Sequence, residues 1–322
     1  MINGINLILI KNHCFYYMAN KICIGTGLIS LDILIRRGEE QAVSYRVGGT
    51  CGNVMMILAY MGWDSYPVAR LNGSENSQTM LEEMAIYGVH TNYISTKDDG
   101  ATPIIVQHNI VDKDGKPTHK FEFRGNKGGF FLDYKPVTKK EAIKVITSLD
   151  FEPAVFFFDR VNPATIAMSE YFKKRQILVY FEPSSLRGNW TQIEKCITNS
   201  DIVKFANQRL PEVAFTEKYN DKLFIQTLGC DGLQFKLFDR DWEKIPAILN
   251  PNIVDTSGAG DWTTATFLDE MLNNNITGIH NLTRTMVKKL LVEAQKKGSE
   301  SCSYEGARGM MFNKVHENIQ KH

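Results

Sequence analysis

The sequence predicts an α/β protein built on a doubly wound, mostly parallel sheet with a small β lid. Short apolar runs alternate with amphipathic stretches along most of the chain, as in repeated βα units. Two β-rich segments, at about 32–47 and 100–125, contain polar turns such as DKDGKP and favour hairpins outside the main sheet. Hydrophobic residues make up 43% and charged residues 23% of the 322 residues, so the chain can bury a large core.

The predicted strands are short apolar runs, and the predicted helices have apolar residues three or four apart. The strands are KICIGTG (21–27), YPVAR (66–70), AVFFFD (154–159), ILVYFEP (177–183), DIVKFA (201–206) and KLFIQTLG (222–229). The helices are NVMMILAYMGW (53–63), MLEEMAIYGV (80–89), NPATIAMSEYFKKR (162–175), LPEVAFTEKY (210–219) and WTTATFLDEML (262–272).

The charge balance argues against a polyanionic partner. Lys and Arg number 37 against 36 Asp and Glu, so no strong field predicts binding to nucleic acid or to an anionic membrane surface. No run reaches the roughly 20 apolar residues needed to cross a bilayer. The six cysteines lack CxxC or zinc spacing, and we interpret them as reduced thiols of a cytoplasmic protein.

The first 17 residues are predicted to be an upstream extension. The run INLILI is apolar but short, and Lys11 follows it instead of preceding it, unlike the pattern of a signal peptide. A second methionine, Met18, opens a run that leads directly into the first core strand. We therefore expect one domain over residues 18–322.

A glycine-rich turn precedes the last of these helices. Gly258, Ala259 and Gly260 let backbone N–H groups approach a phosphate closely, and the start of a helix adds a favourable dipole. Asp261 would lie in the first helical turn, where its carboxylate can accept the proton of an attacking hydroxyl. On spacing alone, Asp261 fits a helix-capping residue equally well.

The turn is part of DTSGAGD, which resembles the C-terminal signature of the ribokinase-like (PfkB) family of carbohydrate kinases. VGGTCGNVMMILAYMGW resembles the family's N-terminal signature, TLGCDG its nucleotide loop and GARG its closing pattern, in the expected order over roughly residues 21–310. The resemblance implies a ribokinase-like fold with ATP-dependent phosphorylation of a sugar or sugar-derivative hydroxyl. It also implies Asp261 as general base, Gly258, Ala259 and Gly260 as the anion hole, and ATP with Mg²⁺ as cofactors.

The resemblance further implies a set of acceptor-binding residues. A matching Asp in the family accepts hydrogen bonds from sugar hydroxyls, and here that residue is Asp32. Gly48 and Gly49 permit close backbone approach, and the amide of Asn53 can both donate and accept. Arg124, at the end of KFEFR, would face the substrate from the lid. The alternatives are a helix cap for Asn53 and a solvated charge for Arg124.

The nucleotide and a monovalent cation are expected on the C-terminal half. Thr227, Gly229 and Gly232 stand in TLGCDG directly after a predicted strand, so this loop can bring a hydroxyl and backbone groups to phosphate oxygens. By its place relative to GARG, Gln295 matches a family position near adenine. Asp255 and Thr256 match positions where many relatives bind a potassium-like ion.

One departure from the family concerns Mg²⁺. Relatives carry a Glu after the strand that matches DIVKF, and that Glu helps to organise water around the metal. In the register set by Lys204, this position holds Arg209, and the preceding polar position holds Ala206. A cation beside the metal would oppose its binding. Either Glu212 or Asn207 takes over, or turnover is reduced.

These departures leave two alternatives to a sugar kinase. A nucleoside kinase of the same fold would offer similar ribose hydroxyls to Asp32 and Asn53. A non-catalytic sugar-binding regulator would explain Arg209, although a mere binder has little need of Asp261. Glu182 also replaces a family Asp, which argues against assigning to this chain the substrate of any one relative.

A protruding lid further suggests a homodimer formed through it.

Overall fold

The structure is a computed structural model, and the part of the chain that it describes is given by residue ranges. These are 20–36, 38–39, 41, 44–111, 113, 117–124, 133–184, 188–211 and 213–312. The predicted extension at 1–17 and the predicted substitute Glu212 lie outside the described residues.

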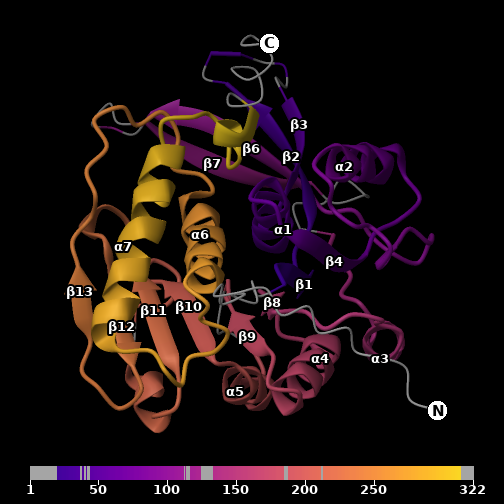
Figure 1. The fold of residues 1–322 in the computed structure, drawn as a ribbon. Coiled ribbons are helices and arrows are strands. Elements are labelled where there is room, and N and C mark those ends of the chain that lie inside the picture. The colour runs from indigo at the N-terminus through magenta and orange to yellow at the C-terminus, as the bar shows by residue number, and fades with distance from the viewer. Residues whose placement is uncertain are drawn as a thin grey trace, which may run out of the picture.

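A large sheet forms the centre of the molecule (Figure 1). Within the described residues it has nine strands in the order β13-β12-β11-β10-β9-β8-β1-β4-β5. Their bounds are β1 Ile22–Thr26, β4 Asp64–Arg70, β5 Ile94–Ser95, β8 Val155–Phe158, β9 Leu178–Phe181, β10 Ile202–Ala206, β11 Leu223–Thr227, β12 Leu233–Leu237 and β13 Glu243–Ile245. Neighbouring strands from β5 to β11 are parallel, and β12 and β13 pair in the antiparallel sense. All four residues of β8 are buried, as expected for a strand covered on both faces.

Helices cover both faces of this sheet, which confirms the doubly wound α/β fold. Their bounds are α1 Thr50–Tyr60, α2 Glu75–Ile86, α3 Lys139–Thr147, α4 Pro163–Lys174, α5 Trp190–Asn199, α6 Ala259–Asn273 and α7 Arg284–Ser301. One apolar core cluster joins α1, α2, α6 and α7 to one face of the sheet. A second joins α3, α4 and α5 to the opposite face.

The helix boundaries follow local chemistry where the sequence carries a clear cap. The side chain of Asn162 accepts hydrogen bonds from the N–H groups of Ala164 and Thr165, and Pro163 occupies the first helical position of α4.

The prediction of an α-helix at 210–219 was wrong. Only a 3₁₀ helix forms there, η1 (Ala214–Lys218), and the hydroxyl of Thr216 bonds to the carbonyl oxygen of Val213. Such local side-chain bonds compete with a continued α-helix.

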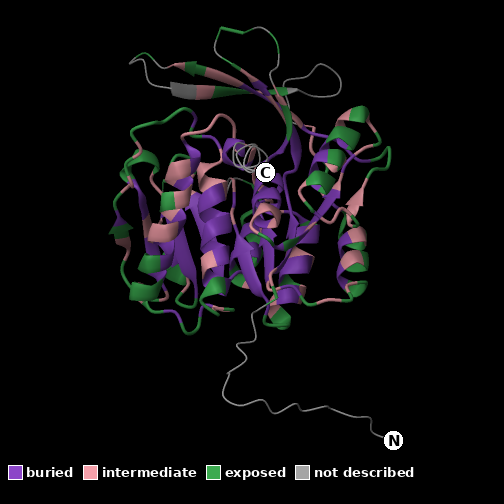
Figure 2. Ribbon diagram, turned by 45° about the horizontal axis from the view of Figure 1, so that its top comes forward, coloured by how far each residue is buried: buried purple, intermediate pink, exposed green. Residues whose placement is uncertain are grey.

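The two β-rich segments form a separate sheet across one end of the α/β body (Figure 2). Its strands are β2 (Ser30–Ile35), β3 (Ser44–Gly48), β6 (Ile104–Val111) and β7 (Pro117–Arg124), in the order β3-β2-β6-β7. This is the predicted small β lid. The strand register places Asp32, Arg46, Ile105 and Phe123 in one row across the sheet, so they share a face. The homodimer through the lid stays a prediction. Among the described residues, no helix has the length and apolar content needed to cross a membrane.

Candidate active site

The predicted site residues gather beyond the carboxyl ends of the parallel strands, where open α/β sheets bind their ligands. Asp159 directly follows β8, Glu182 follows β9, and Arg209 lies just beyond β10. The lid is attached to the same edge, because only residues 27–29 separate β1 from β2. Side chains from several strands and from the lid are therefore available at one end of the sheet.

Helix α6 begins at this edge with the predicted anion hole. Gly258 precedes the helix with φ of 75°, in the left-handed region, and a Cβ added to it would lie 2.3 Å from the carbonyl oxygen of Ala307. Only glycine fits this position without strain. The first-turn N–H groups that follow have no partners within the helix and carry the positive end of its dipole. This start of α6 is suited to hold a phosphate group.

Asp261 lies in this first turn and is half-buried. Asn53, from α1, donates a hydrogen bond from Nδ2 to Oδ2 of Asp261 over 2.7 Å, and the Oδ1 atom of Asn53 is buried without a partner. Burial and the nearby charge of Glu182 raise the pKa of Asp261, Lys204 opposes them, and the net value is about 8. The carboxyl group is thereby poised to exchange a proton near neutral pH.

A buried ion pair contacts the backbone at the start of α6. Lys204 is 2% exposed, and its Nζ atom donates to the carbonyl oxygen of Gly260 over 3.1 Å and contacts Oε1 of Glu182. The hydroxyl of Thr264 donates to the other carboxylate oxygen, Oε2, over 2.6 Å. The ammonium group of Lys204 therefore lies directly under the glycine-rich turn.

The predicted acceptor-binding residues also meet. The hydroxyl of Ser30 donates to Oδ1 of Asp32 over 2.7 Å, and the backbone N–H of Gly49 donates to the same carboxylate. A Cβ on Gly48 would lie 1.9 Å from Cγ of Asp32, so the carboxylate occupies the space that a side chain would fill. Burial raises the pKa of Asp32 to about 6. The lid strand β2 and the turn before α1 are thus joined by this carboxylate.

Asp32 borders a cavity at the lid. Its volume is about 310 Å³, and it lies between the lid and the C-terminal segment 305–312. That segment also adjoins the anion hole, because Ala307 packs against Gly258. The volume lies near the lower end of the range for small-molecule sites, about 300–1,000 Å³.

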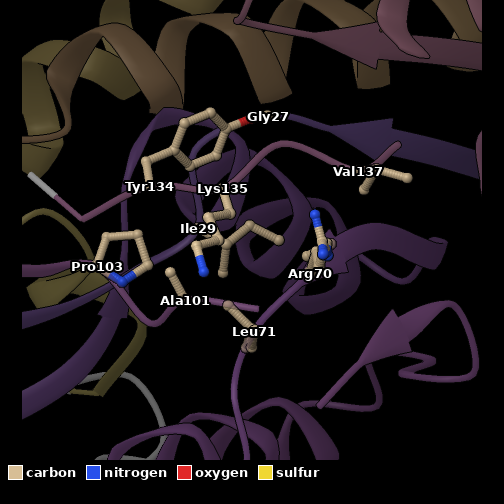
Figure 3. A pocket seen from close by; sticks show the side chains of 10 residues that line it. Gly27, Ile29, Arg70, Leu71, Ala101, Pro103, Tyr134, Lys135 and Val137 are labelled. Atoms are coloured by element: carbon tan, nitrogen blue, oxygen red, sulfur yellow. The ribbon is translucent and has the colours of Figure 1, made fainter. Parts of the chain in front are cut away.

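The second cavity is far smaller, about 10 Å³ (Figure 3). It is lined by Ile29, Arg70 and Tyr134, among others, between the ends of β1 and β4. Burial holds the pKa of Tyr134 well above its usual range. A space of this size accommodates a water molecule at most, so it cannot hold a sugar.

The predicted nucleotide residues form two groups. Thr227 ends β11 opposite Ala206 of β10, which brings its loop beside the strand of Lys204. A Cβ on Gly232 would lie 2.2 Å from the carbonyl oxygen of Ile245. Gln295 donates from Nε2 to the carbonyl oxygen of Pro246 over 3.2 Å, and its buried Oε1 has no partner. Gly232 and Gln295 therefore meet at the same segment.

Gly229 and Arg124 complete the set of predicted site residues. Gly229 has φ of 62° and opens the short 3₁₀ helix η2 (Gly229–Asp231). Arg124 ends the lid strand β7, where its backbone lies opposite Ile104. The substrate contact of Arg124 stays a prediction.

The expected monovalent-cation position is engaged in hydrogen bonds. Oδ2 of Asp255 accepts from Nε2 of Gln107 over 2.7 Å and from the N–H of Gly306 over 2.9 Å. Oδ1 accepts from the N–H of Ser257 over 2.9 Å. Thr256 is exposed. Three donors thus bond to the Asp255 carboxylate, and the bond from Gln107 joins the lid to the body. The cation site at Asp255 and Thr256 stays a prediction.

Among the described residues, those near the expected Mg²⁺ position offer few free metal ligands. Ala206 has no polar side chain, Arg209 is an exposed cation, and both oxygens of Glu182 are taken by Lys204 and Thr264. In the described part of the chain, no group of three or more His, Cys, Asp or Glu side chains could hold a metal ion. Arg209 thus stands where the family has Glu, and Glu182 has no free carboxylate oxygen to take over that role.

Sequence reasoning missed Asp159, which is 1% exposed at the same edge. Its Oδ1 atom accepts from the N–H of Leu28 over 2.8 Å, and a Cβ on Gly27 would lie 1.5 Å from that atom. Burial raises the pKa of Asp159 to about 6. The available signal was an acidic residue directly after the buried run VFFF. The contact of Lys204 with the start of α6 was also missed, because Lys204 was used only to align this segment with the family.

The comparison with protein families is decisive. The model described as pfkB family carbohydrate kinase matches residues 22–310. The chain belongs to this family. The match covers every candidate site residue above, including the whole of the anion hole and the lid. It confirms the resemblance seen in the motifs.

Solved structures of this family share the fold. The ribokinase of Arabidopsis thaliana, solved with ribose and ATP, is 18% identical and has a TM-score of 0.65 over 89% of this chain and 94% of its own. The fructokinase of Vibrio cholerae, solved with fructose, ADP and a calcium ion, is 14% identical, with a TM-score of 0.68 over 91% and 98%. The nucleoside kinase of Burkholderia thailandensis, solved with inosine, is 14% identical, with a TM-score of 0.63 over 89% and 92%. A search of curated protein sequences gave no match.

Proposed function

We propose that this pfkB-family chain transfers the γ-phosphoryl group of ATP to a hydroxyl of a sugar or sugar derivative, with Asp261 as general base. The observation that carries this proposal is the position of the Asp261 carboxyl. It lies in the first turn of α6, beside the anion hole, and burial raises its pKa to about 8. A base with a pKa near the working pH is the most effective.

In the proposed reaction, the oxygen of the acceptor hydroxyl bonds to the γ-phosphorus, and the Asp261 carboxylate accepts the proton of that hydroxyl. The bond from this phosphorus to the bridging oxygen breaks, and ADP leaves. Asn53 holds the carboxylate through its 2.7 Å hydrogen bond. The N–H groups at the start of α6 and the ammonium group of Lys204 stabilise the negative charge on the transferred group. We infer that Mg²⁺ arrives on the nucleotide, as part of the MgATP substrate.

The test is ADP release in a panel of acceptors that includes sugars, sugar acids, sugar phosphates and nucleosides. The proposal expects ADP release above the ATPase background with at least one acceptor. Acceptor binding with ATP present, measured by thermal shift, runs in parallel. Binding without any turnover would instead support the non-catalytic regulator.

A nucleoside acceptor is the second candidate, favoured by two aromatic side chains of the lid. Phe121 and Phe123 are each 41% exposed and share the lid face of Asp32. Exposed rings on the inner face of a lid could stack against a nucleobase, and stacking on such side chains stabilises bases by about 1–3 kcal/mol each. If nucleosides are the acceptors, Phe123→Leu should raise their KM while leaving the KM for free sugars unchanged.

Turnover should depend on pH through Asp261. The rate is expected to rise about tenfold per pH unit up to a pH near 8 and then to level off, because only the ionised carboxylate accepts a proton. The same upward shift of the pKa, from 3.8 to about 8, makes the folded state hold a proton that the unfolded state releases, so the free energy of unfolding falls as pH rises between these two values. A profile of kcat/KM between about pH 6 and pH 9.5 measures the pH dependence of the rate. A rate that is flat over this range would contradict the assignment.

Acceptor affinity should depend on the absence of a side chain at Gly48. In Gly48→Ala the new Cβ would lie 1.9 Å from Cγ of Asp32 and must displace this carboxylate. We expect the KM for the acceptor to rise about ten- to a hundredfold, the effect of losing one charge-assisted hydrogen bond, with the KM for ATP unchanged. Gly278→Ala is the matched control, because a Cβ there meets nothing within 4 Å. An unchanged acceptor KM would remove Asp32 from the acceptor site.

A further inference from the structure

The 310 Å³ cavity next to Asp32 has a cationic end that the proposed chemistry does not use. Arg46 and Arg308 both line it, together with Phe312. The guanidinium carbon of Arg46 lies 4.2 Å from the centre of the Phe312 ring, and that of Arg308 lies 5.6 Å from it. One aromatic ring thus holds two guanidinium groups against the same cavity.

Arg308 is more buried than Arg46, and only some of its N–H donors have hydrogen-bond partners. Its side chain is 2% exposed. Nε and Nη2 donate to the carbonyl oxygen of Val47 over 3.1 and 2.5 Å, and Nη2 also donates to Oε1 of Glu83 over 2.9 Å. Nη1 is buried without any hydrogen-bond partner. A guanidinium carries five donors, and an unpaired buried donor of a charged group is costly, so this one calls for a ligand.

Two carboxylates near the cavity, Glu83 and Glu305, already have partners of their own and leave Nη1 of Arg308 unpaired. Glu83 is engaged by Arg308 and by the N–H of Val47, which donates to its Oε2 over 2.6 Å. Glu305 is engaged by Arg36 over 2.6 Å. Arg46 lies 3.9 Å from Glu83, beyond hydrogen-bond distance, and 46% of its side chain is exposed.

We propose that this end of the cavity binds an anionic group, a carboxylate or a phosphate, carried by the acceptor whose hydroxyls bind at Asp32. This rests on the proposed function and narrows it to acidic or phosphorylated sugar derivatives. Asp32 accepts from hydroxyls, and an anion beside them is held by Arg308 and by Arg46, which lies opposite Asp32 on the neighbouring lid strand. Arg308 supplies the unpaired Nη1 donors, and Arg46 supplies a partly exposed guanidinium held against Phe312.

Arg46→Met tests the proposal without disturbing the core. Methionine keeps an unbranched apolar stem against Phe312 and removes only the charged head. Arg308→Met would leave Glu83 buried without its cation, and loss of folding would obscure the result. Arg240→Met is the matched control, because 70% of the Arg240 side chain is exposed and it does not line the cavity.

The measurement compares matched neutral and anionic acceptors. Glucose with glucuronate, which keeps the pyranose ring, forms the carboxylate arm, and fructose with fructose 6-phosphate forms the phosphate arm. Half-saturating concentrations come from ADP release and from thermal shift with a non-hydrolysable ATP analogue in saturating amount, which keeps the nucleotide phosphate sites filled. We expect the anionic member of at least one pair to bind about tenfold more tightly, equivalent to about 1.4 kcal/mol. Arg46→Met should abolish this preference, and Arg240→Met should keep it.

The outcomes separate this inference from the proposed function. Anion preference lost in Arg46→Met supports the anionic subsite, even if no acceptor yields ADP and the kinase proposal fails. Equal binding of both members in both pairs overturns the subsite, as does a preference that Arg46→Met retains. If neutral sugars are phosphorylated with no anion preference, the kinase proposal stands and the subsite is wrong.

Discussion

Asp261→Asn is expected to lower kcat about 10²- to 10⁴-fold with little change in the KM for ATP, the usual contribution of a general base. The amide of Asn keeps the size of the side chain but cannot accept a proton from the acceptor hydroxyl. The loss should therefore appear in kcat, since the start of α6 and the lid cavity are unchanged. Initial-rate ADP release with the best acceptor of the panel measures it.

Glu270→Gln is the matched control for this change. Glu270 lies near the other end of the same helix, and the substitution is the same conversion of a carboxylate to an amide. It should leave kcat unchanged, and Asp261→Asn should still bind ATP and acceptor. Full turnover by Asp261→Asn, in a folded protein, would show that another group is the base.

Lys204→Met is expected to lower the free energy of unfolding by about 3–5 kcal/mol, the cost of breaking a buried ion pair from one side. Lys204 is 3% and Glu182 13% exposed in their side chains, so the carboxylate left behind cannot be hydrated well. Urea denaturation measures the change. Because Lys204 lowers the pKa of Asp261, its removal should also move the pH profile of any remaining activity to higher pH.

Two further variants separate these effects from a general loss of packing. Lys204→Met with Glu182→Gln removes both charges, and it should recover a large part of the lost stability. Lys288→Met breaks the contact of Lys288 with Glu243, in which 51% of the lysine side chain is exposed, and should cost about 0–1 kcal/mol. A loss below about 1 kcal/mol for Lys204→Met would mean that the pair contributes little.

Most of the fold could be predicted because its signals are local. Apolar runs such as VFFF of β8 are buried throughout, and Asn162 with Pro163 marks the start of α4. The segment 210–219 shows the limit of such signals. Its composition suits an α-helix, yet it forms a short 3₁₀ helix in which Phe215 packs against Phe205 and Phe224. Those contacts come from neighbouring strands, and tertiary packing overrides helix propensity.

The candidate site was predictable to a smaller extent. Motifs indicated Asp261, Asn53 and Asp32, but they could not show that Gln107 of the lid bonds to Asp255. A carboxylate in a cation-binding motif looks the same in sequence whether an ion or an amide faces it. The Arg209 departure was visible in the sequence, whereas only the structure shows that Lys204 and Thr264 engage both oxygens of Glu182.

By itself the sequence determined the alternation of βα units, the glycine-rich turn and the position of Asp261 directly after it. Backbone geometry and burial patterns of this kind depend on near neighbours in the chain. The tertiary structure alone decided the chemistry of that carboxyl. Asn53 lies 208 residues away from Asp261, and Glu182 and Lys204 reach it from other strands. A pKa depends on burial and on charges close in space. Arg308 is a similar case, since only folding brings this residue to the cavity of Asp32 and leaves its Nη1 atom buried without a partner.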